Sequence, residues 1–456
     1  MNPRIPRACL ARAGRSLSLS SVCRVTPRRC FSRARQRLGE HKDDRLRFPG
    51  ALEAKFTTDL NFHNPKDNDV ISCYRVMDSE GVIVDKTYKR DFSDEEAVKL
   101  YTDMLGVSIM DLICLDAQRQ GRISFYMVSS GEEGIAVGSS SALSVEDVAF
   151  AQYREVGFLM QRGFTFTDAM SQLFANIKDP GRGRNMPVHY GSTALNVHTI
   201  SSPLATQLPH AAGAAYALKM QHLSSPKSSP RIAVCLFGEG AASEGDFHAA
   251  FNIAATRGCP VLFICRNNGY AISTPTADQY RGDGIVSRAA GYGINSIRVD
   301  GNDILAVREA TKRAKDLCLG TSDGGEAKPV FIEAMSYRVS HHSTSDDSFA
   351  YRARVEVEDW KRRDNPITRF RKYLENEGLW DDAKETEARL SIKKELLKAF
   401  SAAEKEKKPE ILSMFEDIYE ELTPELKAQR AELKDILERY PDEYDLSEYD
   451  KGKDSL

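Results

Sequence analysis

The sequence predicts an α/β fold, in which a doubly wound parallel sheet is preceded by an N-terminal arm and followed by a C-terminal helical appendage. Residues 232–237 and 261–265 are short and apolar throughout, which suits strands that are buried on both faces of a sheet. Between them, apolar residues recur at helical spacing up to Gly258, which is typical of a helix end. Two further strand-like runs, 296–299 and 330–335, enclose a second helical segment. Strands that alternate with helices in this way indicate a parallel sheet with helices on its faces.

The first residues of the chain have a strongly biased composition. Residues 1–39 contain ten Arg and five Ser but not one Asp or Glu, as in a mitochondrial presequence. We predict a presequence over residues 1–31, cut before Ser32, and therefore a protein of the mitochondrial matrix. A basic arm for nucleic acid is the alternative, but arginines spaced by Leu, Ser and Val suit an amphipathic import helix better. Without residues 1–39 and their ten arginines, the formal charge changes from −3 to −13, which argues against a general nucleic-acid binder.

Composition also limits the class of protein. The 456 residues fit a globular protein of two or three domains, and no apolar run approaches the ~20 residues needed to span a bilayer. Of nine cysteines, three lie in the predicted presequence. The other six form no CxxC pair, and several lie in strand-like runs, so we expect buried free thiols rather than disulfides or a zinc site.

We divide the remaining chain into three parts. Residues 32–90 form a polar N-terminal arm with one hairpin-like piece and a turn at 78–81. Residues 91–350 form the α/β domain, and residues 351–456 form a helical, highly charged region that is poor in glycine. The C-terminal region is therefore expected to be an appendage and not a second catalytic domain.

Several elements of the α/β domain follow from the sequence pattern. A helix is expected from Ser93 to about Gln118, and residues 121–127 are strand-like. Ser243 and Asp246 have the spacing of a capping box at the start of the helix that ends before Gly258. Asp303 is expected to cap the helix between the last two strands.

The central feature is the strand–helix–strand unit at residues 231–274. Its first strand ends at Gly238-Glu239-Gly240, and its second strand leads into Arg266-Asn267-Asn268-Gly269-Tyr270. Parallel strands end at the same edge of a sheet, so Glu239 and Asn268 are expected to meet there. A carboxylate and an amide oxygen suit Mg²⁺, which is usually held by one or two protein groups and by phosphate oxygens of a ligand. The glycines and the helix N-terminus suit a bulky anion.

Three interpretations of this unit compete. It could be a structural turn between buried strands. A dinucleotide-binding fold fits less well, because the third glycine of its motif and the ribose-binding acid about 20 residues further on are missing. The third is the diphosphate-binding motif of thiamin diphosphate enzymes, which the Gly-acid-Gly and Asn-Asn pattern resembles, although the usual acid is Asp and here it is Glu239.

Other segments carry residues suited to anions or to proton transfer. Arg154, Arg182 and Arg184 lie near glycines, as at phosphate sites, although by composition they are more typical of a solvated surface. Residues 199–207 are typical of an ordinary loop before a helix rich in small residues. Two histidines, His341 and His342, begin a polar loop at the carboxyl end of the last strand, where ligands of α/β proteins bind.

Taken together, the motifs QYRE, SSPLATQ, GEGAASEGD, RNNGYAISTPT, QYRGDGI and HHSTSDDS resemble the alpha subunits of branched-chain 2-oxo acid dehydrogenases. These are the thiamin-dependent decarboxylase components of mitochondrial multienzyme complexes, and the resemblance covers roughly residues 55 to 445. It implies the thiamin diphosphate-binding fold. Alpha subunits that act on pyruvate are the alternative, but they would be expected to carry Asp in the first glycine motif and a different histidine loop.

The resemblance implies a set of site residues. Its thiamin diphosphate contacts fall on Tyr153, Arg154, Ser202, Leu204, Gly238, Glu239, Ala241, Arg266 and His342. Its Mg²⁺ ligands fall on Glu239, Asn268 and the backbone carbonyl of Tyr270. A loop that holds a monovalent cation, K⁺, matches Ser201, Pro203, Thr206 and Gln207. Ser343 matches a serine that a dedicated kinase phosphorylates, whereas the second regulatory serine of the animal enzymes is replaced by Ala353.

The resemblance also implies partners and a division of labour. A beta subunit supplies the glutamate that activates the cofactor, so an α₂β₂ heterotetramer is expected, together with a lipoyl-bearing acyltransferase core, a regulatory kinase and a phosphatase. His342 is the expected catalytic residue, since a histidine with a pKa near 7 can pass a proton as the acyl group moves to a lipoyl sulfur.

Two further hypotheses are disfavoured by particular residues. A nucleotide-dependent oxidoreductase needs an acid at the end of the second strand, where Arg266 stands instead. A non-catalytic regulatory or scaffold homologue would be expected to lose the metal ligands or His342, and all of them are present.

Overall fold

The computed structural model describes residues 45–46, 54–55, 57–322 and 324–456. The chain divides into two units, Met1–Asn64 and Pro65–Leu456. In the first unit, β1 (Arg45–Leu46) pairs antiparallel with β2 (Ala54–Lys55). The predicted presequence, residues 1–31, lies outside the described residues.

The second unit is built on a parallel sheet. Within the described residues this sheet has six strands in the order β3-β9-β10-β6-β5-β4, and every pair is parallel. The strands are β3 (Cys73–Tyr74), β4 (Val148–Phe150), β5 (Ala233–Gly238), β6 (Val261–Asn267), β9 (Asn295–Asp300) and β10 (Val330–Met335). Two short strands, β7 (Tyr270–Ala271) and β8 (Thr274–Pro275), form a separate antiparallel pair. The predicted doubly wound parallel sheet is confirmed.

Helices account for most of the rest. The first nine are α1 (Asp94–Arg119), α2 (Glu133–Ser141), α3 (Val156–Gln161), α4 (Phe166–Leu173), α5 (Gln207–Ser224), α6 (Gly245–Arg257), α7 (Thr276–Gln279), α8 (Ser287–Gly291) and α9 (Ile304–Leu319). The C-terminal region contains α10 (Arg354–Arg363), α11 (Pro366–Asn376), α12 (Asp382–Lys405) and α13 (Pro424–Arg439). None of the helices in the described ranges is long and apolar enough to cross a membrane.

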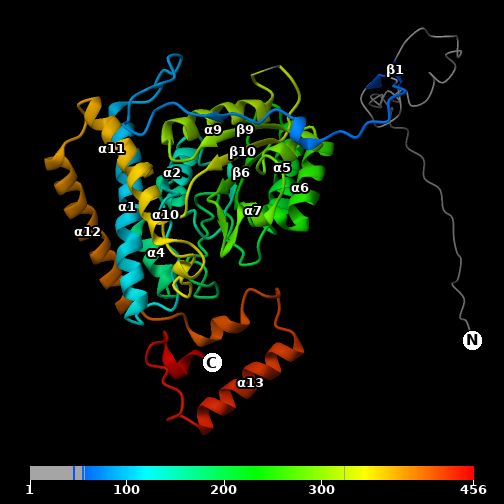
Figure 1. Ribbon diagram of the computed structural model, residues 1–456. Coiled ribbons are helices and arrows are strands. Elements are labelled where there is room, and N and C mark those ends of the chain that lie inside the picture. The colour runs from blue at the N-terminus through cyan, green and yellow to red at the C-terminus, as the bar shows by residue number, and fades with distance from the viewer. Residues whose placement is uncertain (1–44, 47–53, 56, 323) are drawn as a thin grey trace, which may run out of the picture. The chain divides into compact units, whose positions relative to one another are not determined.

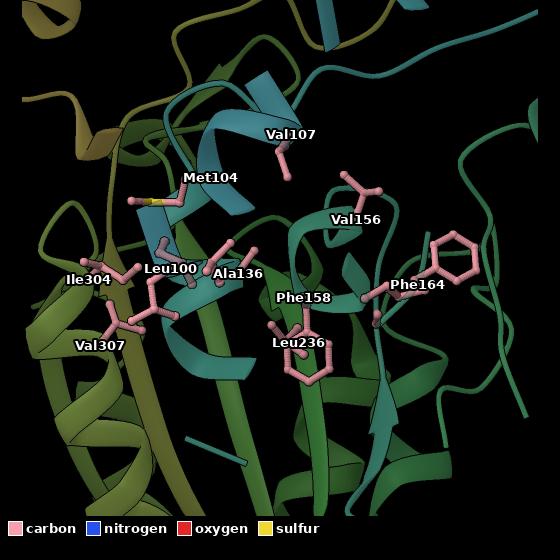
Figure 2. Close-up of a cluster of buried hydrophobic side chains, with 14 of the residues drawn as sticks. Leu100, Met104, Val107, Ala136, Val156, Phe158, Phe164, Leu236, Ile304 and Val307 are labelled. Carbon is pink, nitrogen blue, oxygen red and sulfur yellow. The ribbon is translucent and has the colours of Figure 1, made fainter. Parts of the chain in front are cut away.

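The sheet separates two apolar cores. Helices α5 and α6 lie on one side of it, and α1, α2 and α9 lie on the other (Figure 1). Because side chains of a strand alternate between faces, Val234 and Leu236 of β5 enter the core with α1 and α9, whereas Cys235 and Phe237 enter the core with α5 and α6. Figure 2 shows the first of these cores, in which Leu236 lies among side chains of α1, α2, α3 and α9. Burial on both faces explains why β5 is apolar without alternation.

Most predicted helix ends are found where the sequence placed them. Ser93 accepts from the backbone N–H of Glu96 in a complete capping box, and Asp303 accepts from two N–H groups of α9. Gly258 ends α6 at a φ of +56°, a conformation that favours glycine. The predicted capping box of Ser243 and Asp246 is wrong, because Ser243 ends a short 3-10 helix (Ala241–Ser243) and α6 begins after Glu244 without a side-chain cap.

The predicted strand over residues 121–127 is also wrong. Backbone N–H groups in this segment and just after it donate to side chains and not to a neighbouring strand. Tyr126 N–H donates to the Thr344 hydroxyl at 3.4 Å, and Ser129 N–H donates to the carboxylate of Asp111 at 2.7 Å. The edge strand β4 was not predicted, because three residues are too few for a periodic pattern. In the arm, the hairpin is supported by the antiparallel bridge between Met77 and Ile83, and β3 joins the main sheet.

The C-terminal helices differ in how they pack. Helices α11 and α12 contact α1, and α12 also contacts α4. Buried residues of α11 and α12, such as Phe370 and Phe400, extend the core on the α1 side. Helix α13 has no buried residue among those the structure describes. The six cysteines of the described ranges are free, and all except Cys73 are buried, as predicted.

Candidate active site

A cavity of about 260 Å³ lies where β5 and β6 end. The predicted site residues that line it are Tyr153, Arg154, Leu204, Gly238, Glu239, Ala241, Arg266, Asn268, Tyr270 and His342. They come from the segment before α3, the loop before α5, the turns after β5 and β6, and the loop after β10. Five stretches of sequence therefore contribute to one cavity at the carboxyl edge of the sheet, where ligands of α/β proteins bind.

Glu239 and Asn268 are neighbours in this cavity. The backbone N–H of Glu239 donates to the carbonyl of Arg266 at 3.1 Å, and the backbone N–H of Asn268 lies 3.5 Å from Glu239 Oε2. Glu239 is 2% exposed, and its Oε1 has no hydrogen-bond partner in the described part of the chain. Burial raises the pKa of Glu239 to about 7, and the nearby carboxylate of Glu132 adds to this effect. A buried carboxylate oxygen without a donor is suited to a cation.

The side chain of Asn268 has a defined orientation. Its Nδ2 donates to Glu132 Oε1 at 2.9 Å, and its Oδ1 accepts from the backbone N–H of Tyr270 at 3.2 Å. A carboxylate only accepts, so the amide nitrogen must face Glu132 and the amide oxygen must face the other way. The carbonyl of Tyr270 lies 3.4 Å from the guanidinium of Arg338.

Two buried arginines provide positive charge. Arg154 and Arg266 are both 2% exposed. Arg266 forms ion pairs with Glu132 and Glu155, and these carboxylates raise its pKa above the usual value although burial alone would lower it. Arg154 lies 3.8 Å from Glu132, and this pair of guanidiniums holds the pKa of Glu132 below its usual value against the effect of burial. Glu132 therefore serves both arginines, and Glu155 is a second counter-ion of Arg266.

His342 is held as a neutral imidazole. Its Nδ1 lies 3.3 Å from Arg154 Nη2 and 3.4 Å from Arg338 Nη1, and guanidinium groups only donate. The proton of the neutral ring is therefore on Nε2. Burial, followed by the charges of Arg154 and Arg338, lowers the pKa of His342 to about 3. The expected pKa near 7 is wrong for this arrangement, because the sequence did not reveal that two cations flank the ring.

The loop after β10 is tied down on several sides. The backbone N–H of His342 donates to Asp346 at 2.7 Å, and the carbonyl of His342 accepts from Arg154 at 2.5 Å. The hydroxyl of Tyr351 donates to the same Asp346 carboxylate at 2.7 Å. Ser343 follows His342 directly, is partly exposed, and its hydroxyl accepts from the backbone N–H of Ser345 at 3.2 Å.

The predicted cation loop lies beside the cavity. Thr206 Oγ1 is 3.0 Å from the hydroxyl of Ser201 and 3.1 Å from the carbonyl of Pro203, so three oxygens gather at one point. Gln207 is buried at the start of α5, and its Nε2 donates to the carbonyl of Leu236 at 3.2 Å. Ser202 does not line the cavity, and its hydroxyl is bonded to His189 at 2.8 Å.

Arg182 and Arg184 lie elsewhere. Their side chains pair with Glu416 and Asp417 of the C-terminal region, so they serve tertiary packing and not the cavity. Sequence reasoning missed several lining residues: Gln152, Gly240, Ser243, Glu244, Ala271, Ile272, Thr274, Gln279 and Arg338. It also missed Glu132, although a pair of acids between two glycines at residues 131–134 was a usable signal.

The residues present fit a metal-bound diphosphate. The carboxylate oxygen Oε1 of Glu239 has no donor within the described residues, and the amide of Asn268 is oriented by Glu132. Both groups lie beside the buried guanidiniums of Arg154 and Arg266. Within the described ranges, no group of three or more His, Cys, Asp or Glu side chains could hold a metal ion. A cation at Glu239 would therefore take most of its oxygens from a ligand or from water, as Mg²⁺ does in phosphate sites.

Comparison with known proteins places the chain in a family. The family model of the dehydrogenase E1 component matches residues 101–412. Three curated relatives are each named 2-oxoisovalerate dehydrogenase subunit alpha, mitochondrial. The Caenorhabditis elegans protein is 50% identical over 90% of this chain and 92% of its own length. The Mus musculus protein is 48% identical over 98% and 97%, and the Homo sapiens protein is 49% identical over 90% and 89%. The chain therefore belongs to the dehydrogenase E1 component family.

Proposed function

We propose that this chain is the alpha subunit of a branched-chain 2-oxo acid dehydrogenase. With a beta subunit, it carries out oxidative decarboxylation of the 2-oxo acids derived from Leu, Ile and Val, and transfers the acyl group to a lipoyl group on an acyltransferase component. The observation that carries this proposal is the single cavity that joins the unpaired Glu239 oxygen, two buried arginines and His342. The names of the relatives favour a branched-chain substrate over pyruvate, and favour a mitochondrial location.

The residues of the cavity would hold thiamin diphosphate through its charged end. The cofactor supplies, when bound, a carbon nucleophile and an electron sink for loss of CO₂. Glu239, Asn268 and the carbonyl of Tyr270 would hold Mg²⁺, and Arg154 and Arg266 would offset the diphosphate charge. The remaining contacts would come from Tyr153, Ser202, Leu204, Gly238 and Ala241. A monovalent cation, K⁺, would be held by Ser201, Pro203, Thr206 and Gln207, and would fix the loop around Ser202.

His342 would donate a hydrogen bond through Nε2 while its ring is neutral, and would give up a proton only from the protonated ring. Its Nδ1 faces two guanidiniums, so the ring enters the reaction neutral and with Nε2 protonated. An anion bound by Arg154 and Arg266 would offset the positive field on the ring and raise its pKa from about 3. His342 would thereby approach the range in which a histidine both gives and takes a proton.

A partner must complete the site. In the proposed division of labour the beta subunit supplies the glutamate that activates the cofactor, and the two chains form an α₂β₂ heterotetramer. The alpha subunit alone should then release no CO₂ from any 2-oxo acid, even with saturating thiamin diphosphate and Mg²⁺. Turnover by the separate chain at a rate similar to that of the complex would refute the shared site.

Ser343 would be a regulatory site for a dedicated kinase and phosphatase. A phosphate there adds about −1.5 to −2 charges next to His342. At ~8 Å from an incoming carboxylate and an effective dielectric near 20, the repulsion is about 3 to 4 kcal/mol, which slows turnover roughly a few hundredfold. Ala353 cannot be phosphorylated, so control would depend on Ser343.

Co-expression with a beta subunit tests the proposed function. Decarboxylation should be measured with 3-methyl-2-oxobutanoate and with pyruvate, at equal concentrations and with Mg²⁺, K⁺ and thiamin diphosphate present. We expect the branched substrate to have the higher kcat/KM. A clear preference for pyruvate would instead support the second candidate, an alpha subunit that acts on pyruvate.

A further inference from the structure

The turn at residues 186–189 presents a nearly buried histidine that the cofactor site does not use. Val188 has a φ of +65°, which is unfavourable for a β-branched residue, and it is 2% exposed. Gln172 of α4 clamps this turn, because its Nε2 donates to the carbonyl of Met186 at 2.7 Å and its Oε1 accepts from Val188 N–H at 3.0 Å. Strain of this kind persists only where the surroundings impose it. The turn is therefore a rigid support for the side chain that follows, His189.

The imidazole of His189 has one possible tautomer. Its Nδ1 lies 3.0 Å from the carbonyl of Pro187, and a carbonyl only accepts, so Nδ1 carries the proton. Nε2 then has a free lone pair and accepts from the hydroxyl of Ser202 at 2.8 Å. The ring is 5% exposed, so this hydrogen bond is protected from water at its His189 end.

Ser202 belongs to the loop 201–206, which has few other attachments. Ser202, Pro203 and Leu204 are exposed, and Ala205 has a φ of +65°. The hydroxyls of Ser201 and Thr206 bond within the loop. Among the residues that the structure describes, the bond to His189 is the only hydrogen bond that ties residues 201–206 to a segment other than the following helix. Apart from the packing of Ala205, which is fully buried in the core with α5 and α6, the position of this loop therefore depends on His189.

We propose that His189 is a positioning residue that holds Ser202, and with it the loop that lines the cofactor cavity and gathers the cation ligands. This inference rests on the proposed function, since it concerns the binding of thiamin diphosphate and K⁺. The His189 ring, fixed through Nδ1 by the carbonyl of Pro187, holds Nε2 at one point, where it bonds the hydroxyl of Ser202. Without it, the loop would have to be ordered during binding, which weakens affinity.

The test uses the co-expressed alpha–beta protein. The substitutions distinguish the general size of the side chain at residue 189 from the position of its hydrogen-bond acceptor. The amide of His189→Gln lies near the position of Nε2, whereas the amide of His189→Asn lies near that of Nδ1. We expect His189→Asn and Ser202→Ala to raise the Kd for thiamin diphosphate about tenfold, and His189→Gln to restore most of the affinity. Without cofactor, KCl should raise the Tm of the wild type more than choline chloride does. This difference should be smaller in His189→Asn and Ser202→Ala, and His189→Gln should restore most of it. The matched control is His198→Ala, because His198 stacks on Phe150 and is exposed.

The outcomes separate the inference from the proposed function. If the wild-type protein binds no thiamin diphosphate, the proposed function itself fails. If the wild type binds it and His189→Asn lowers Tm but leaves both the Kd and the KCl effect unchanged, His189 only supports the fold, and the inference is overturned. If His189→Asn does not fold, the exposed Ser202→Ala decides, because it removes the donor of the same bond. Unchanged affinity in Ser202→Ala would also overturn the inference.

Discussion

Replacement of Glu239 by Gln should stabilise the cofactor-free protein in a pH-dependent way. The carboxyl is 2% exposed and one of its oxygens has no partner within the described residues, so its ionised form is costly without a bound cation. The pKa of Glu239 is raised to about 7 in the folded chain, from an unperturbed 4.5. The folded state therefore binds more protons than the unfolded state between these values. Stability due to this group is fully present below pH 4.5 and is lost as the pH rises through 7.

The magnitude follows from the shift. A difference of about 2.5 pKa units corresponds to about 3 kcal/mol at pH 8, and to about 1 kcal/mol at pH 5. Glu239→Gln keeps the shape and removes the charge, so we expect it to raise the free energy of unfolding by these amounts. Urea unfolding of wild type and variant, both freed of metal and cofactor, measures the difference at each pH. A variant that is no more stable than the wild type at pH 8, or a difference that does not change with pH, would show that ionisation of Glu239 does not destabilise the folded protein.

The remaining predictions concern other residues of the cavity. Asn268→Ala should leave the fold intact but weaken thiamin diphosphate binding by at least about 100-fold in a titration with Mg²⁺, and near-normal affinity would exclude it as a ligand. In nitrogen NMR of the cofactor-free protein, His342 should stay neutral with its proton on Nε2 down to pH 5, since its pKa is lowered to about 3. Because of this lowered pKa, the contribution of His342 to the free energy of unfolding falls as the pH drops below 6.5. A titration of His342 near pH 6.5 would contradict the lowered pKa. Ser343→Glu should inactivate the assembled enzyme, and Ser343→Ala should stay active and insensitive to the kinase. Inhibition of Ser343→Ala by the kinase would place the switch elsewhere.

The sequence predicted the parallel sheet well because its strands are buried on both faces. The runs at β5 and at residues 261–265 of β6 are apolar throughout, β10 is interrupted only by Glu333, and glycines or caps mark the helix ends between them. The predicted strand at residues 121–127 failed because local apolar content does not show where backbone groups find partners. Those partners include the Asp111 carboxylate and the Thr344 hydroxyl, which are distant in sequence.

The cavity was predictable where two strands end side by side, and less so where charges interact across the fold. Glu239 and Asn268 follow from the parallel strand ends, since neighbouring parallel strands finish at one edge. The role of Glu132 depends on its contacts with Arg266 and Asn268, which span more than 130 residues of sequence. For the same reason, the neighbours that lower the pKa of His342 could not be found by spacing alone.

Binding of thiamin diphosphate in this cavity should depend on a cation held by Glu239. Calorimetric titration of the co-expressed alpha–beta protein with thiamin diphosphate, in the presence and absence of Mg²⁺, tests it most directly. We expect Mg²⁺-dependent binding to the wild type and loss of that binding in Glu239→Ala. Mg²⁺-dependent binding of the same affinity in Glu239→Ala would contradict it.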